Sequence, residues 1–190
     1  MIVEKHKIRH DQPVIKQLDE TAINRIAAGE VVERPSSAVK ELIENSIDAG
    51  ATKIDLVIKD SGKTLVQVID NGRGIANNYL ALAFQRHSTS KLKTAKDLFN
   101  LKTKGFRGEA LSSISAISHV ETISRTAKDS IAKSIKIQGN EILSEDYKVA
   151  PIGTSFSVRN LFFNIPARRN FLKSDLVELK HIIEEFNRVV

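Results

Sequence analysis

The sequence has no cysteine and no tryptophan, and aromatic residues make up only 5% of its 190 residues. Without cysteine the chain can form neither a disulfide framework nor a thiolate metal site. Its few aromatic residues do not alternate with basic ones, as they do in proteins that stack single-stranded bases. No apolar run approaches the roughly eighteen residues of a membrane span, and the N-terminus lacks the apolar region of a signal peptide. We therefore expect a protein that works inside a cell.

The composition is that of a globular protein with a positive net charge. Hydrophobic residues make up 41% and charged residues 27%, which is sufficient for a core, and the length suggests one domain. The formal net charge of +6 favours an anionic partner such as a nucleotide or nucleic acid. Part of this charge lies in residues 1–14, which we interpret as a solvated basic tail before a domain over residues 15–190.

Hydrophobic periodicity predicts helices mixed with hairpin-linked strands. Helices are expected after a cap near Asp19 or Thr21, at 35–51 with Gly50 as the stop, and at 77–87, 108–118 and 174–190. Strands are expected at 52–60, 63–70, 120–127, 134–139 and 153–163, the first two joined by a hairpin turn. This order predicts an α+β fold, a two-layer α/β sandwich with one mixed, mostly antiparallel sheet and helices on one face.

Two glycine motifs that suggest familiar nucleotide folds are incomplete. The segment "GKT" at 62–64 is not a P-loop, because Val57 stands where that motif requires a glycine. The segment "GRGIAN" at 72–77 is not a dinucleotide fingerprint, because Asn77 replaces its third glycine. The sequence therefore favours neither fold.

The predicted helix at 36–48 has a polar face opposite an apolar one. At about 100° per residue, Glu41, Asn45 and Asp48 share one side, and the other side carries Val39, Leu42, Ile43, Ser46 and Ile47. A solvated surface is one interpretation of the polar face. The other is a chemical site, because an Asn oxygen suits Mg²⁺ and a nearby carboxylate can activate a water.

Asp70 ends an apolar strand and is followed by Gly72 and Gly74. A carboxylate there can simply cap a turn. It can also accept a hydrogen bond from the amino group of a base, with the two glycines letting the backbone pass close to a flat ring. The hydroxyl of Thr154, at the start of the predicted strand 153–163, can support such a ring site or belong to an ordinary strand.

Glycines also precede the predicted helix at 108–118, in the segment "KGFRGEAL". Backbone N–H groups at Gly105 and Gly108, together with the helix N-terminus, can form an anion-binding nest. The alternative is an ordinary glycine-rich start of a helix. Nearby cations add positive charge: Lys91, Lys102, Lys104 and Arg107.

Together these segments resemble, in order, the four motifs of the Bergerat-fold (GHKL) ATPases. The matching patterns are Glu41-x-x-x-Asn45, Asp70-x-Gly72-x-Gly74, Gly105-x-x-Gly108-x-Ala110 and Gly153-Thr154. Within that superfamily, "GFRGEAL" at 105–111 resembles the hallmark of the MutL DNA mismatch-repair proteins. The segments 25–51, 87–92 and 161–172 agree with the same subfamily, and the resemblance covers about residues 15–190.

The resemblance implies a slow, Mg²⁺-dependent ATPase that binds ATP and ADP. Glu41 would be the general base, Asn45 the Mg²⁺ ligand, and Asp70 the acceptor for the adenine amino group. Gly72, Gly74 and Thr154 would complete the base site. A lid over the phosphates would comprise Thr89, Ser90, Lys91, Gly105, Phe106, Arg107, Gly108, Glu109, Ala110 and Leu111. The family usually has Tyr and Thr where this chain has Phe163 and Ile165, and we expect little effect on nucleotide binding.

The resemblance also implies a compartment and partners. The compartment would be the cytoplasm for a bacterial protein and the nucleus for a eukaryotic one. In relatives the lid orders on ATP binding and drives homodimerisation, so we expect a monomer without nucleotide. DNA and a MutS-type mismatch sensor are expected partners of the full-length protein. Family members continue into a second, transducer domain that supplies a lysine to the γ-phosphate, so we expect weak hydrolysis from this 190-residue chain. Two alternatives remain: a non-catalytic, nucleotide-gated interaction module, and a topoisomerase or sensor-kinase ATPase domain.

Overall fold

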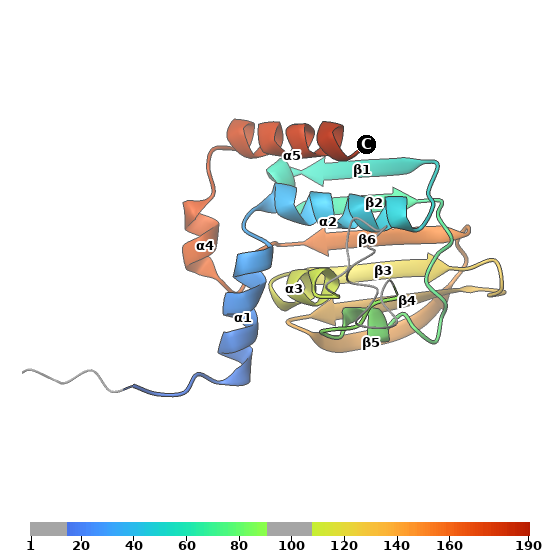
Figure 1. Ribbon diagram of the computed structural model, residues 1–190, viewed down its shortest axis with the longest axis horizontal. Helices are drawn as coiled ribbons and strands as arrows, with labels where there is room; N and C mark the ends of the chain where they lie inside the picture. The colour runs from blue at the N-terminus through green and yellow to red at the C-terminus, as the bar shows by residue number, and fades with distance from the viewer. Residues whose placement is uncertain (1–14, 91–107) are drawn as a thin grey trace, which may run out of the picture.

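A six-stranded sheet forms the centre of the protein in the computed structural model, which describes residues 15–90 and 108–190 (Figure 1). In spatial order its strands are β1 Ile54–Lys59, β2 Leu65–Asp70, β6 Gly153–Arg159, β3 His119–Arg125, β4 Ala132–Gln138 and β5 Glu141–Lys148. Every strand pairing within the described residues is antiparallel, so the predicted mostly antiparallel sheet is confirmed. The predicted tail at 1–14 and the predicted site residues Lys91, Gly105, Phe106 and Arg107 lie outside the described residues.

The last strand in the sequence lies in the middle of the sheet. β6 pairs with β2 on one side and with β3 on the other. Its residue Thr154 is therefore opposite Asp70 of β2 and opposite Ser124 of β3. Residues directly opposite each other in a sheet point to the same face, so these three side chains form one row.

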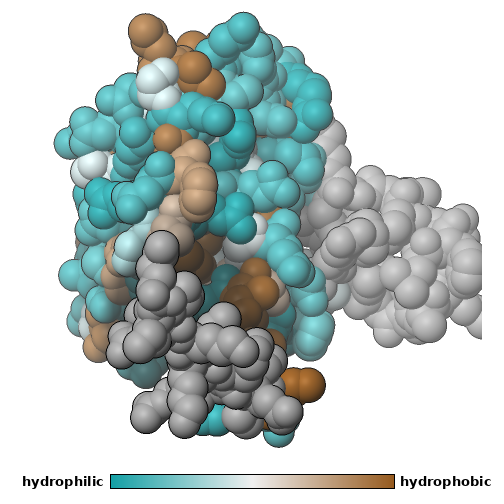
Figure 2. Space-filling model, turned by 90° about the vertical axis from the view of Figure 1, so that its left-hand side faces the viewer, coloured by the Kyte–Doolittle hydropathy of each residue, from teal (hydrophilic) through white to brown (hydrophobic). Residues whose placement is uncertain are grey.

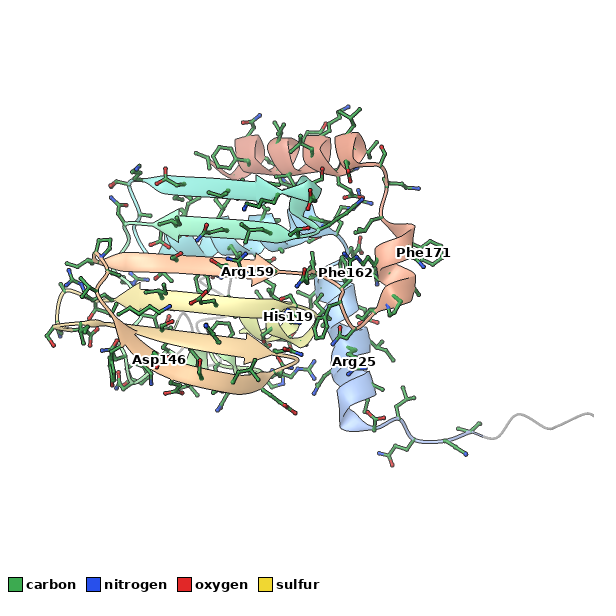
Figure 3. All side chains as sticks on the ribbon, turned by 180° about the vertical axis from the view of Figure 1, so that it is seen from behind. Arg25, His119, Asp146, Arg159, Phe162 and Phe171 are labelled. Carbon is green, nitrogen blue, oxygen red and sulfur yellow. The ribbon has the colours of Figure 1, made fainter. Side chains whose placement is uncertain are left out.

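Five α-helices accompany the sheet in the described ranges: α1 Glu20–Val31, α2 Pro35–Asp48, α3 Ala110–Ala116, α4 Pro166–Phe171 and α5 Asp175–Val189. α2 and α3 cover one face of the sheet, and α5 lies along the β1 edge, beside α2 (Figure 1). Seen from behind, the sheet shows a face without helices, on which Arg159 and Asp146 are labelled (Figure 3). The predicted two-layer arrangement is confirmed.

Local sequence signals explain where the first two helices begin and end. The Asp19 carboxylate caps α1 by accepting a hydrogen bond of 2.7 Å from the N–H of Ala22, as predicted. α2 begins with Pro35 at its first position, where the missing N–H costs nothing. It ends in a Schellman motif, in which the Ala51 N–H donates to Ser46 O (3.1 Å) and Gly50 takes a positive φ of 75°.

The core lies between the sheet and the helices that cover it. The predicted apolar side of α2 faces inward: Val39, Leu42 and Ile43 are fully buried. The sheet contributes Val66, Val68, Val120, Phe156 and Val158 to the same cluster. Full burial of an aliphatic side chain contributes about 1.5–3 kcal/mol, so this face fixes α2 firmly on the sheet.

The predicted helix at 77–87 is wrong. The segment forms turns and a short 3₁₀ helix, η2, at Leu82–Phe84. The Ile75 N–H donates to Ser124 Oγ (2.8 Å), and Asn77 Nδ2 donates to Ile131 O (3.2 Å). These long-range bonds, with the burial of Phe84, override a local helical preference.

Sequence periodicity also missed β5 and α4. β5 is an edge strand whose side chains are mostly exposed, so its sequence lacks the alternation that marks a half-buried strand. α4 has six residues, none of them buried, and its main local signal is Pro166 at the first turn.

The face shown in Figure 2 is mainly hydrophilic where the described residues are drawn. α1, α4 and the start of α5 form one end of the molecule, where separate apolar groups interrupt a polar surface (Figure 2). Phe171, 81% exposed, and Leu176, 82% exposed, lie in this region. Among the helices of the described ranges, none combines the length and the apolar character needed to cross a bilayer.

Replacing Gly153 with alanine should destabilise the fold strongly. Its φ is +127°, and a Cβ there would lie 2.0 Å from the backbone oxygen of Asp70. We expect a loss of about 2–4 kcal/mol in the free energy of unfolding, measured by urea denaturation. The matched control is Gly139→Ala, because Gly139 also has a positive φ (+57°) but open space around it. That control should cost about 1 kcal/mol; equal losses in the two variants would contradict the close contact between β6 and β2.

Candidate functional site

A cavity of about 1140 Å³ opens between α2, the end of β2 and the start of α3. Its lining includes Glu41, Asn45 and Asp70, which sequence analysis placed in one site. From the predicted lid it includes Thr89, Ser90, Gly108, Glu109, Ala110 and Leu111. Thr154 and Gly74 also line it. The structure therefore brings residues from all four sequence motifs to one cavity.

The polar face of α2 forms one wall of this cavity. Glu41 and Asn45 lie one helical turn apart, on the side opposite the buried residues. Asp48, one turn further along, also lines the cavity. Lys40 lies 3.8 Å from the Glu41 carboxylate and 3.8 Å from the Glu44 carboxylate, which adds a cation to this wall. The polar face is therefore more than a solvated helix surface.

Asp70 lies at the floor of the cavity and is only 7% exposed. Its Oδ1 accepts hydrogen bonds from the N–H groups of Gly72 (2.9 Å) and Thr154 (3.3 Å). Its Oδ2 accepts a bond from Ser46 Oγ (3.0 Å). A buried charge requires such partners, and three donors from different segments fix the orientation of the carboxylate. Asp70 thus caps its turn and also faces the cavity.

Ser46 is a supporting residue that sequence analysis assigned to the apolar side of α2. It is 1% exposed, and its hydroxyl lies within hydrogen-bond distance of Leu42 O (3.1 Å) as well as Asp70. The available signal was a polar residue among apolar ones at helical spacing. Such a residue needs a partner when buried, and here the partner is the carboxylate of the site.

The two glycines after Asp70 have different positions. Gly74 lines the cavity, and its φ is +73°. A Cβ on Gly74 would lie 2.1 Å from Arg125 O, so no larger residue fits against β3 there. Gly72 is not among the lining residues. It packs against Ala49, which a Cβ would meet at 2.8 Å, and its N–H holds Asp70.

The loop that carries Gly74 is anchored to β3 and to the connection between β3 and β4. Ile75 and Asn77 make the bonds to Ser124 and Ile131 described above. In the same connection, Thr126 donates from its hydroxyl and its N–H to Asp129. These bonds hold the pKa of the Asp129 carboxyl below its ordinary value. The loop beside Asp70 is therefore fixed by the sheet.

The opposite end of the cavity lies between residues 87–90 and 108–111. His87 Nδ1 lies 3.4 Å from Glu109 Oε1, which connects the two segments. A Cβ on Gly108 would meet Ser88 O at 2.8 Å, so the backbones are also in contact. Arg86 lines the same cavity and donates to Asn24 Oδ1 of α1 (2.7 Å). This part of the cavity combines hydroxyls with the guanidinium of Arg86, groups that can bind an anion.

Several lining residues were missed by sequence analysis. The apolar or aromatic ones can provide a surface for a flat ring and include Ile75, Tyr79, Leu82 and Phe156. Arg73 also lines the cavity and donates to Asp48 O (2.7 Å). Phe156 lies within the predicted strand 153–163, and nothing in the local sequence distinguishes a side chain at the cavity wall from one beneath it.

The oxygen donors on the cavity wall suit a divalent cation that is held partly by the protein and partly by a bound ligand. Within residues 15–90 and 108–190, no group of three or more His, Cys, Asp or Glu is arranged to hold a metal ion. The Asn45 amide on the cavity wall is a hard oxygen donor. Mg²⁺ commonly takes only one or two protein ligands and completes its shell with water and phosphate oxygens. The residues present therefore fit Mg²⁺ that arrives with a phosphate.

Comparison with known proteins identifies the same family as the motifs. Residues 32–161 match the family of Histidine kinase-, DNA gyrase B-, and HSP90-like ATPases. The chain is 58% identical over 176 residues to a DNA mismatch repair protein MutL of Christiangramia forsetii, covering 93% of this chain and 28% of that protein. It is also 58% identical to a DNA mismatch repair protein MutL of Flavobacterium psychrophilum, covering 93% and 29%. The chain thus spans less than a third of these relatives.

A solved structure has the same fold. The Aquifex aeolicus MutL ATPase domain complexed with ADP matches with a TM-score of 0.61 and 35% sequence identity. The match covers 81% of this chain and 53% of that one. Because that domain was solved as a complex with ADP, a relative with this fold binds an adenine nucleotide.

Proposed function

Since the chain belongs to the histidine kinase-, DNA gyrase B- and HSP90-like ATPase family and, within it, resembles the MutL ATPase domain, we propose that it binds ATP in this cavity and hydrolyses it slowly. ADP, the product, occupies the same place. The observation that carries the proposal is the opening of Glu41, Asn45 and Asp70 onto one cavity from two different elements.

The Asp70 end of the cavity binds the adenine ring. The carboxylate is fixed by its three donors and accepts a further hydrogen bond from the amino group of the base. Ile75 and Phe156 provide apolar surface, and Gly74, whose missing side chain lets the loop pack against Arg125 of β3, lines the cavity beside them. Recognition by a charged, immobile acceptor is specific, because a mismatched ligand leaves that charge without a partner.

The α2 wall carries the chemistry. The Glu41 carboxylate holds a water by hydrogen bonding and takes its proton as the water attacks the γ-phosphorus. The bond from the γ-phosphorus to the bridging oxygen breaks, and that oxygen leaves on ADP. The Asn45 oxygen would hold Mg²⁺, which neutralises phosphate charge when bound. Phosphoryl transfer needs mainly positioning, and a helix packed on the sheet through its buried side chains gives both residues fixed positions.

The far end of the cavity binds the phosphates and closes over them. Thr89, Ser90 and the segment Gly108–Leu111 supply hydroxyls and backbone N–H groups. Lys91, Gly105, Phe106 and Arg107 would complete this lid, as the resemblance implies. Ordering of the lid on ATP would then favour a homodimer over the monomer.

Further partners follow from the relatives. Because those relatives are DNA mismatch repair proteins, DNA and a MutS-type mismatch sensor are the expected partners, and the net charge of +6 suits a DNA contact. The relatives named above are bacterial, which favours the cytoplasm as the working compartment.

Replacing Asp70 with asparagine should abolish tight nucleotide binding without loss of fold. An Asn oxygen can still accept from Gly72 and Thr154, while its Nδ2 can donate to Ser46 Oγ. The acceptor for the base is then missing, and we expect the Kd for ATP, measured by calorimetric titration, to rise at least about tenfold. The control is Asp55→Asn on the neighbouring strand, where the side chain is 52% exposed. Unchanged ATP affinity in Asp70→Asn would exclude base recognition by Asp70.

Replacing Glu41 with alanine should separate binding from turnover. Phosphate release should fall about 100-fold or more, because general base catalysis contributes about that much. The Kd for ATP should change by less than about threefold, since Glu41 contacts the water and not the nucleotide. Glu141→Ala, on the exposed strand β5, is the control and should retain both properties. Full turnover in the Glu41 variant would refute its role as the base, and binding without any wild-type turnover would favour a non-catalytic, nucleotide-gated module.

Nucleotide should also control the oligomeric state. Light scattering should give the mass of a monomer, 21.1 kDa, for the free chain and about twice that mass with a saturating non-hydrolysable ATP analogue. The Asp70→Asn variant should stay monomeric under the same conditions, because it cannot bind the analogue. An unchanged mass for nucleotide-saturated wild type would contradict ATP-driven dimerisation of this chain.

A further inference from the structure

Ser124 lies beneath the base end of the cavity and is 1% exposed. It belongs to the row that crosses β2, β6 and β3, directly opposite Thr154, which is itself opposite Asp70. Asp70 and Thr154 line the cavity, whereas Ser124 is not among the lining residues. Ser124 can therefore affect a ligand only through its neighbours.

The hydroxyl of Ser124 has three close partners. The N–H of Ile75 donates to it at 2.8 Å, Gly153 O lies 3.1 Å away, and Thr154 Oγ1 lies 2.8 Å away. A serine hydroxyl has one proton and two acceptor lone pairs. Ile75 can only donate and the Gly153 carbonyl can only accept, so these two partners use one lone pair and the proton.

The remaining contact then has only one possible direction. With its proton on Gly153 O, Ser124 Oγ must accept from the hydroxyl of Thr154. The opposite direction would leave the buried contact between Ser124 Oγ and Gly153 O without a proton, which costs free energy. The proton of Thr154 is thus committed to Ser124, and its two lone pairs remain.

We propose that Ser124 is a positioning residue for base specificity: it turns the Thr154 hydroxyl so that this group presents only acceptor lone pairs to the cavity, beside the acceptor carboxylate of Asp70. The base end of the site therefore offers two adjacent acceptors. A purine with an amino group at C6 has two N–H donors that match them. The inference rests on the proposed adenine site and names what makes that site selective.

The experiment compares the affinities of two nucleotides for wild type and for variants of the chain. ATP and purine riboside triphosphate differ only in the C6 amino group, which a hydrogen atom replaces in the second. Wild type should bind ATP at least about tenfold more tightly. In Ser124→Ala the Thr154 proton is free to turn toward the cavity. The C6 amino group of ATP then loses its hydrogen-bond acceptor on Thr154, whereas purine riboside triphosphate has no amino group at C6 and loses no such bond. The ratio of the two dissociation constants should therefore fall by about fivefold, the contribution of one neutral hydrogen bond.

This ratio separates the proposed role from a structural one. Loss of the Ile75 contact alone would loosen the loop beside Asp70. It would weaken the binding of both nucleotides by the same factor and leave the ratio of their dissociation constants unchanged. That result would overturn the proposal. The matched control is Ser157→Ala on β6, because Ser157 is also buried (5% exposed) but bonds to Gln67 on the face without helices. Its ratio should equal that of wild type.

A second variant keeps the proposal testable if Ser124→Ala does not fold. Thr154→Val preserves the shape of the side chain and removes the hydroxyl that Ser124 orients, so its ratio should fall by a similar factor. Adding Ser124→Ala to it should change the ratio no further, because the group through which Ser124 acts is gone. A Thr154→Val ratio equal to that of wild type would also overturn the proposal. Failure of wild type to bind either nucleotide would instead refute the proposed function. A refuted role for Ser124 can therefore be distinguished from a refuted nucleotide site.

Discussion

The carboxylate of Asp70 accepts hydrogen bonds from three separate parts of the chain: Ser46 on α2, Gly72 in the loop after β2, and Thr154 on β6. A buried charge without such partners would cost several kcal/mol, so the fold is stable only when these three parts meet. The same bonds join the helical layer to two strands of the sheet. The position of α2 and the position of the Asp70 carboxylate are therefore set by one interaction network.

α2 has a structural side and a chemical side. Its buried residues hold the helix on the sheet, and the opposite face presents Glu41 and Asn45 to the cavity. Both residues inherit the rigidity of the packed helix, which suits a reaction that depends on positioning. The arrangement requires glycine at two positions in the backbone beside Asp70. Gly74 and Gly153 have positive φ there and make contacts that no side chain would permit.

Sequence reasoning found the site more completely than it found the fold around it. The motif residues Glu41, Asn45 and Asp70 could be predicted because their residue types and order carry chemical information, and the structure places all three at one cavity. The segment at 77–87 was misassigned because its conformation depends on long-range bonds that no local pattern encodes: Ile75, just before it, bonds to Ser124 of β3, and Asn77 bonds to Ile131. β5 was missed because an exposed edge strand needs no apolar alternation. Ser124 was missed because a serine inside a strand has no distinctive local signature.

The faces and ends of the first two helices could be predicted from the sequence by itself, because local interactions determine them. Helical spacing separated the two faces of α2, Asp19 capped α1, and Gly50 ended α2, because each depends on neighbours within one or two turns. The tertiary structure decided which of the candidate residues meet. Thr154 reaches Asp70, 84 positions earlier, only because β6 inserts between β2 and β3 in one register. A shift of one residue would turn every side chain of that strand to the opposite face, so the site exists only in the folded sheet.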